Sequence, residues 1–132
     1  MSILLFEYDN RYEPPAPVAT IRLVGVGSRV QTVQVQALLD SGADATMIPE
    51  SILRQIGAML QDTAQMRGVN DVVRRVKLYD VLVEVANQRM RILAVAMPPH
   101  STVIVGRDVL NRLKVTLDGF SSYTTIETLF DD

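Results

Sequence analysis

Residues 35–53, VQALLDSGADATMIPESIL, place three small polar residues inside an otherwise apolar run. Asp40, Ser41 and Gly42 follow an Ala-Leu-Leu segment, and Ala43 comes directly after them. Asp, Ser and Gly are common turn formers, so an ordinary surface turn is one interpretation. The apolar flanks favour a second one, in which the triplet lies at depth and its carboxylate needs a specific partner. A second carboxylate that shares one proton with the first would be such a partner.

Around this stretch, apolar residues mostly recur with a period of two, which predicts β-strands. Pro49 predicts the start of a short helix that ends at Gly57, and residues 106–113, GRDVLNRL, predict a second one. The order strand, glycine, helix occurs twice, which is a weak internal repeat. The strands are predicted over residues 19–23, 33–39, 72–86, 90–97, 101–105 and 114–117.

The composition describes one ordinary globular domain of 132 residues, 48% hydrophobic and 21% charged, with a mean hydropathy of +0.16. A chain of this length buries about two thirds of its unfolded surface, which is enough for one core but not for two lobes with a cleft between them. Any large cleft therefore needs a partner chain.

Charge and residue usage exclude several classes of function. The net charge of -2 and the pI near 5.3 give no basic field for nucleic acid. Without cysteine there is no thiolate metal site and no cysteine nucleophile, and the single histidine, His100, lies in the loop-like segment MPPHST. We expect no metal and no other cofactor. The apolar run ILLF near the N-terminus is too short for a signal peptide or a membrane span, so we expect no membrane association and a cytoplasmic protein.

Two motifs, LLDSGADATMI at residues 38–48 and VIVGRDVL at residues 103–110, resemble the retropepsins, the retroviral-type aspartic proteases, and their single-lobe cellular and bacterial relatives. The resemblance covers residues 18–120. It implies a mainly β, single-lobe acid-protease β-barrel with two short helices that acts as a twofold homodimer.

On this basis the chain divides into three parts. Residues 1–17, with three prolines, are expected to form an N-terminal arm, residues 18–120 the protease domain, and residues 121–132 a tail that is a possible dimer-interface strand. The resemblance also implies that residues 66–85 contain a flap hairpin and the strand that follows it.

The resemblance also implies a role for individual residues. Asp40 matches the catalytic aspartate, Ser41 the hydroxyl residue that hydrogen-bonds across the dimer axis, and Gly42 the glycine whose backbone lies along the substrate. Asp44 and Arg107 match an ion pair inside one protomer, and two solvated surface charges are the alternative. The candidate substrate-binding residues are Ala43, Asp44, Ile48, Gly68, Val69, Asn70, Thr102 and Ile104. Core packing is an equally good interpretation of Ala43, Ile48, Thr102 and Ile104.

The Asp-Ser-Gly triplet occurs only once in the sequence. A twofold dimer supplies the second carboxylate, because Asp40 near the axis meets Asp40 of the other copy. We therefore expect an aspartic endopeptidase that hydrolyses extended peptides with an Asp40/Asp40 dyad and a water nucleophile. The alternative is a dimeric peptide-binding or scaffold module that has the same fold and cleaves little.

Overall fold

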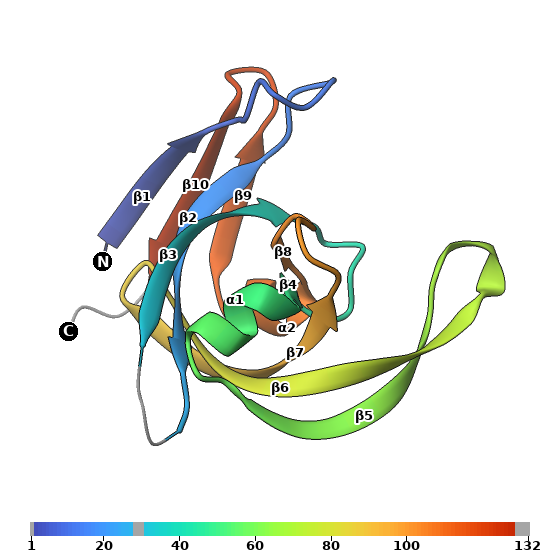
Figure 1. Ribbon diagram of the computed structural model, residues 1–132. Helices are drawn as coiled ribbons and strands as arrows, with labels where there is room; N and C mark the ends of the chain where they lie inside the picture. The colour runs from blue at the N-terminus through green and yellow to red at the C-terminus, as the bar shows by residue number, and fades with distance from the viewer. Residues whose placement is uncertain (1, 28–30, 129–132) are drawn as a thin grey trace.

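The computed structural model describes residues 2–27 and 31–128, which form a β-barrel, a long hairpin and a small second sheet (Figure 1). This part of the chain is mainly β with two short α-helices, which confirms the class predicted from the sequence. The strands are β1 Ser2–Glu7, β2 Val18–Gly25, β3 Thr32–Leu39, β4 Met47–Pro49, β5 Met59–Arg67, β6 Val73–Val85, β7 Gln88–Met97, β8 Ile104–Val105, β9 Lys114–Asp118 and β10 Tyr123–Thr128. The helices are α1 Glu50–Gln55 and α2 Arg107–Leu110.

Seven strands form the barrel sheet in the order β2-β3-β8-β4-β7-β6-β5, and an additional pairing of β2 with β6 closes the barrel. Most neighbours are antiparallel, but β3 pairs with β8, and β4 with β7, in parallel. The β3–β8 pairing matters for function, because it brings the ends of the two sequence motifs side by side.

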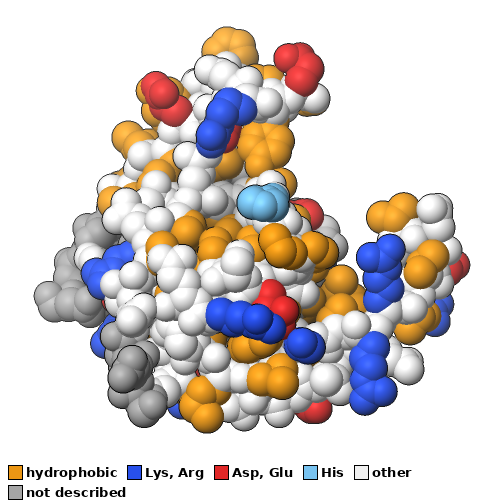
Figure 2. All heavy atoms as spheres, in the orientation of Figure 1, with side chains coloured by type: hydrophobic (Ala, Val, Ile, Leu, Met, Phe, Trp, Pro, Cys, Tyr) orange, Lys and Arg blue, Asp and Glu red, His pale blue; other side chains and the backbone are white. Residues whose placement is uncertain are grey.

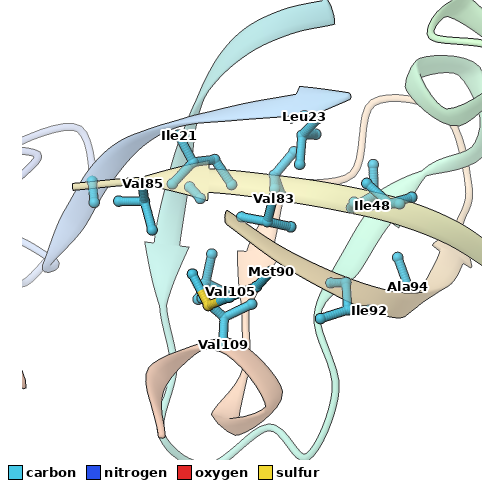
Figure 3. Close-up of a cluster of buried hydrophobic side chains, with 14 of the residues drawn as sticks. Ile21, Leu23, Ile48, Val83, Val85, Met90, Ile92, Ala94, Val105 and Val109 are labelled. Atoms are coloured by element: carbon cyan, nitrogen blue, oxygen red, sulfur yellow. The ribbon is translucent and has the colours of Figure 1, made fainter. Parts of the chain in front are cut away.

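The barrel strands bury one face, as their alternating sequences predict. In β2, Ile21 and Leu23 are buried, whereas Thr20 and Arg22 are exposed. Burial of one Val, Leu or Ile side chain stabilises the fold by about 1.5–3 kcal/mol, so the interior cluster contributes strongly to folding. Figure 3 shows this cluster, in which the labelled residues are Ile21, Leu23, Ile48, Val83, Val85, Met90, Ile92, Ala94, Val105 and Val109.

Helix α1 lies where the sequence predicts it. Pro49 precedes it with a φ of -54°, Glu50 is its first residue, and Leu53 packs into the core. Gly57 follows the helix with a φ of 71°, a left-handed conformation that glycine adopts at little cost.

The hairpin of β5 and β6 extends well beyond the barrel, and its tip is the short turn Val69–Asp71 (Figure 1). The sequence predicts β6 but not β5, because seven of the nine side chains of β5 are exposed and show no clear alternation. Pairing with β6, from Met59↔Asp80 to Arg67↔Val73, is what makes this segment a strand.

The small sheet has the order β1-β10-β9 and joins the two ends of the chain. The expected N-terminal arm contains a strand, because Ser2–Glu7 pairs with Tyr123–Thr128 from Ser2↔Thr128 to Glu7↔Tyr123. Of the expected tail, Tyr123–Thr128 forms β10, which pairs with β1 and β9 of its own chain, and residues 129–132 lie outside the described residues. The division of the chain at residues 18 and 120 stays a prediction.

Two predicted elements are shorter in the structure. Of the strand expected over residues 101–105, only β8 forms. The chain before it makes a turn in which the Ser101 N–H donates to the Pro98 carbonyl (3.3 Å), so pairing in the sheet begins later than predicted. The helix expected over residues 106–113 is α2 alone. After it, the Leu113 N–H bonds to the Leu110 carbonyl (3.1 Å), an i to i+3 turn tighter than an α-helix.

Candidate active site

Asp40 is the first residue after β3, and its backbone position is fixed by the parallel pairing with β8. Leu38 and Leu39 lie opposite Ile104 and Val105. The Asp40 N–H then donates to the Val105 carbonyl at 3.0 Å, which extends this ladder by one bond. The backbone that carries the Asp40 carboxylate is therefore fixed by the sheet rather than free in a loop.

The Asp40 side chain is oriented by the turn that it starts. Its Oδ1 accepts a hydrogen bond from the Gly42 N–H at 2.8 Å, and the Ala43 N–H donates to the Asp40 carbonyl at 3.2 Å. A Cβ atom on Gly42 would lie 3.1 Å from Asp40 Oδ1, so a larger residue there would press on the carboxylate. The turn therefore directs Oδ1 of Asp40 towards the backbone N–H of Gly42.

Arg107, the first residue of α2, holds the turn from the second motif. Its Nη1 donates to the Ser41 carbonyl at 2.7 Å, and its Nη2 forms an ion pair with Asp44. Its own backbone N–H donates to the Ala43 carbonyl at 2.9 Å. One residue therefore contacts three positions of the loop that follows Asp40.

Behind the loop, Thr46 and the half-buried Asp108 form a polar contact that the sequence analysis did not select. Thr46 is fully buried, and its hydroxyl donates to Asp108 Oδ1 at 2.7 Å while its N–H donates to Oδ2 at 3.0 Å. The Thr46 hydroxyl also accepts from the Gly106 N–H at 3.2 Å. The sequence feature that could have identified this contact is the polar residue Thr46 inside the otherwise apolar segment ATMI.

Gly106 lets the two motifs meet backbone to backbone. A Cβ atom there would lie 2.6 Å from the Ala45 carbonyl oxygen and 2.9 Å from that of Ala43. Any side chain would therefore push α2 away from the loop, and with it Arg107 and Asp108.

The triplet is less buried than its flanks predict. Leu39 and Ala43 are buried, but Ser41 and Gly42 are exposed and Asp40 is half-buried. The expectation of a triplet at depth is therefore wrong for the isolated chain, because the strand ends at the surface and only its neighbours reach the core.

The structure gathers some of the predicted site residues and separates others. Ile104 pairs with both Leu38 and Met47, so it lies beside Asp40 together with the loop residues 41–44 and Arg107. Ile48 is fully buried in the core, which is the alternative that the sequence left open. Thr102 is exposed and lines a shallow hollow near Asp9 and Arg11.

Gly68, Val69 and Asn70 lie at the exposed tip of the hairpin, at the end away from the barrel (Figure 1). Asn70 and Asp71 have φ values of 67° and 58°, a conformation that Asn and Asp tolerate better than most residues. The Gly68 N–H donates to the Val72 carbonyl at 2.9 Å and closes the turn.

A groove of about 470 Å³ lies between the hairpin, α1 and the segment after β7. Figure 2 shows the hollow between the body and the hairpin, with basic side chains on the hairpin side. Among the described residues its lining includes none of the predicted substrate-binding set; it consists of Glu50, Ser51, Arg54, Met66, Arg74, Arg75, Val76, Lys77, Ala96, Met97, Pro98 and Pro99.

Glu50 links α1 to β6 at the base of this groove. The Tyr79 hydroxyl donates to Glu50 Oε2 at 2.8 Å, and Lys77 Nζ lies 3.4 Å from the same oxygen. The Tyr79 hydrogen bond, together with the charge of Lys77, lowers the pKa of Glu50 below its usual value. The groove floor therefore carries an ionised carboxylate among basic residues.

No group of three His, Cys, Asp or Glu side chains within residues 2–27 and 31–128 is placed to hold a metal ion. Within the same ranges, no helix has the length and apolar character to cross a bilayer.

Comparison with known proteins places this geometry in a family. A family model for the retroviral aspartyl protease matches residues 14–118. The chain is similar in structure to a retropepsin-like aspartic protease from Rickettsia conorii, with a TM-score of 0.64 and 12% identity over 95% of this chain and 90% of that one. It is also similar to the EIAV protease complexed with the inhibitor HBY-793, with a TM-score of 0.48 and 20% identity over 73% and 86% of the two chains. No curated protein sequence matches it.

The likeness to the Rickettsia protein confirms the retropepsin-like fold that the sequence predicts. The family match spans both motifs, from before β2 to the end of β9. The chain therefore belongs to the retroviral aspartyl protease family.

Proposed function

We propose that this protein is an aspartic endopeptidase that works as a twofold homodimer, with Asp40 of each copy forming the catalytic dyad. The observation that carries the proposal is the Asp40 carboxylate, held by the Gly42 N–H at 2.8 Å in a turn that is exposed in the single chain. Family membership supports peptide hydrolysis in general. The single Asp-Ser-Gly triplet requires that the second carboxylate come from another copy.

The mechanism follows from two carboxylates held close together, which share one proton because both cannot ionise at once. The ionised member takes a proton from a bound water, and the water oxygen attacks the peptide carbonyl carbon. The protonated member hydrogen-bonds the carbonyl oxygen and stabilises the negative charge that develops there. The C–N bond breaks after a proton reaches the leaving nitrogen, and no covalent enzyme intermediate forms.

The loop architecture supports this role for Asp40. Arg107 binds the Ser41 carbonyl at 2.7 Å and pairs with Asp44, so the turn is held from one side by a single side chain. A carboxylate that must meet its copy across an axis needs such a fixed backbone, because small displacements reduce catalysis strongly. We assign Ser41 and Gly42 to the axis and to the substrate backbone, respectively.

We propose an extended peptide as the substrate. Ala43, Asp44 and Ile104, close to Asp40, would contact the residues next to the scissile bond. Thr102 and the hairpin-tip residues Gly68, Val69 and Asn70 would contact the peptide further out or from the opposite side. Ile48 would support the pocket wall from the core rather than contact the peptide, since it is fully buried. Main-chain hydrogen bonds to the hairpin would hold the peptide in an extended form.

The decisive test is digestion of a diverse peptide library by the wild-type protein and by Asp40→Asn across a range of pH. The amide keeps the shape of the carboxyl but cannot act as the base, so we expect cleavage with an acidic optimum that disappears in the variant. Asp62→Asn, a change of an exposed carboxylate on β5, is the matched control and should cleave as wild type does. Equal cleavage by pure, folded Asp40→Asn protein would overturn the assignment. Peptide binding without cleavage by either protein would support the scaffold alternative instead.

A further inference from the structure

The groove between the hairpin, α1 and residues 96–99 is positively charged, although the whole chain has a net charge of -2. Four of the described residues that line it are basic and one, Glu50, is acidic. Basic side chains lie on the hairpin side of the hollow (Figure 2). None of the lining residues takes part in the mechanism proposed above, so the charge of the groove has no role in it.

Glu50 balances the basic residues at the end of the groove next to α1. Arg54 Nη2 lies 3.5 Å from Glu50 Oε1, and Lys77 Nζ lies 3.4 Å from Glu50 Oε2. The other two basic residues, Arg74 and Arg75 of the hairpin, form no ion pair within residues 2–27 and 31–128. The unbalanced positive charge therefore lies at the hairpin end of the groove.

Arg75 is directed over the groove by the strand that carries it. Side chains alternate across a strand, so Arg75 lies on the face of β6 that also carries Lys77 and Tyr79. This face is turned toward α1, because Lys77 and Tyr79 both contact Glu50. Arg75 Nη2 donates to the neutral Thr63 hydroxyl at 3.2 Å. A guanidinium group has five N–H donors, so this bond leaves most of them available to a ligand.

The lining between these charges is apolar and accessible. Its apolar residues are half-buried or exposed, and they are Met66, Val76, Ala96, Met97, Pro98 and Pro99. The described lining residues include no aromatic side chain. Proteins commonly bind single-stranded nucleic acids by stacking bases on aromatic rings, so this lining favours a peptide over a nucleic acid. Aliphatic side chains beside two unpaired arginines fit a peptide that carries both apolar and acidic residues.

The groove is connected to Asp40 through the barrel sheet. The pairings β3–β8, β8–β4 and β4–β7 separate the end of β3, where Asp40 lies, from Ala96 in the groove. Adjacent strands lie about 4.8 Å apart and an extended peptide advances about 3.4 Å per residue, so these three steps correspond to about four peptide residues. A peptide with its scissile bond at Asp40 is therefore long enough to enter the groove with an outer residue.

We propose that this groove binds acidic residues of the peptide substrate, about four positions from the scissile bond, through Arg74 and Arg75. The inference rests on the proposed function and names a substrate class for it. Arginine suits this role, because its planar guanidinium can donate two parallel hydrogen bonds to one carboxylate. Each copy of a twofold dimer carries one groove, so acidic residues on both sides of the scissile bond would be bound. Glu50 repels a substrate carboxylate from the other end of the groove.

Peptide binding to the Asp40→Asn protein tests the proposal without catalysis. The probe is a fluorescent peptide with an apolar centre and glutamates toward both ends, compared with the same peptide carrying glutamines. In fluorescence anisotropy we expect the glutamate peptide to bind about five to ten times more tightly, because exposed ion pairs are individually weak. Added salt should reduce this preference, since it screens exposed charges. Equal affinities for the two peptides at low salt would overturn the proposal.

Charge reversal tests whether the preference arises at the two arginines. In the Asp40→Asn background, Arg74→Glu/Arg75→Glu should favour the glutamine peptide, and Arg74→Gln/Arg75→Gln should bind both peptides alike. The milder glutamine variant carries the test if the reversal disrupts the hairpin, which circular dichroism would detect. Arg112→Glu changes an exposed arginine that lines a different hollow, so it is the matched control and should keep the preference. A glutamate preference that persists in both double variants would contradict the assignment to Arg74 and Arg75.

A single-stranded oligonucleotide of the same net charge as the glutamate peptide tests the rival ligand. Tighter binding of the oligonucleotide, lost in the same double variants, would overturn the assignment of the groove to a peptide.

The two proposals fail separately. Cleavage of library peptides by the wild-type protein with no preference for acidic residues away from the scissile bond would support the peptidase and reject the groove. Glutamate-selective binding by a protein that cleaves nothing would support the groove and reject the peptidase.

Discussion

Thr46 and Thr124 are both fully buried threonines, but their hydroxyl groups have different surroundings. The Thr46 hydroxyl donates to Asp108 and accepts from the Gly106 N–H, so it joins the loop that follows Asp40 to the start of α2. The Thr124 hydroxyl has no hydrogen-bond partner among the described residues. A buried polar group without a partner costs about 1–3 kcal/mol, whereas the same group with good partners is close to neutral or favourable.

The two residues should therefore respond oppositely to the same substitution. Thr124→Val keeps the branched shape and removes the unpaired hydroxyl, so we expect the free energy of unfolding to rise by about 1 kcal/mol. Thr46→Val removes the hydroxyl donor to Asp108 and leaves the buried Gly106 N–H without its acceptor, so it should lower the free energy of unfolding by about 2 kcal/mol. Urea denaturation of the three proteins measures both changes. A loss of stability in Thr124→Val would show that its hydroxyl makes a contact worth more than its burial costs.

At the scale of the elements, β6 is shared between the barrel and the hairpin, and its pairing with β7 is reinforced by a side-chain contact. Asp80 on β6 is 5% exposed, and Arg91 on β7 donates from Nε to its Oδ1 at 2.9 Å, with further bonds to Oδ2. These hydrogen bonds, with the charge of Arg91, lower the pKa of Asp80 below its usual value. The β6–β7 contact therefore depends on an ionised carboxylate.

The lowered pKa of Asp80 predicts how this contact responds to acid. A carboxyl group with a depressed pKa in the folded state contributes stability above its unfolded pKa and loses that contribution as the pH falls through the folded pKa. Asp80→Asn should lower the free energy of unfolding by about 2 kcal/mol at pH 7, and the difference from wild type should shrink below about pH 4. Urea titrations at several pH values measure this. A difference that stays constant with pH would mean that the loss arises from packing rather than from the charge of Asp80.

At the scale of the whole molecule, one chain provides one Asp40, in a turn that is exposed in the single chain. The proposed function therefore makes the dimer, rather than the chain, the unit of catalysis. A mixed dimer of wild type and Asp40→Asn would hold one Asp and one Asn at the axis, and would lack either the base or the shared proton.

Subunit mixing tests this stoichiometry. After free exchange, fully wild-type dimers form in proportion to the square of the wild-type fraction, so activity at fixed total protein should follow a parabola. Dilution below the dimer dissociation constant should also lower the specific activity. Tagged subunits confirm that exchange is complete. A straight-line dependence on the wild-type fraction would show that one Asp40 is enough for catalysis.

Much of the barrel and part of the candidate site could be predicted from the sequence, because they depend on local patterns. Alternation predicts β2, β3, β6 and β7, since each has one buried and one exposed face. Pro49 and Gly57 bound α1 through their own backbone preferences. The Asp-Ser-Gly triplet and the Gly-Arg-Asp triplet are likewise visible as short motifs, although their contact with each other is not.

Only the tertiary structure decided the features that join distant segments. Ser2 pairs with Thr128, and Thr46 bonds Asp108, through contacts that no local pattern encodes. Strand β5 exists because β6 provides its hydrogen bonds, not because its exposed side chains alternate. Ile48 belongs to the core because the parallel pairing of β4 with β7 turns it inward. Periodicity in the sequence predicts which residues are buried, whereas the topology of the chain determines which residues they pack against.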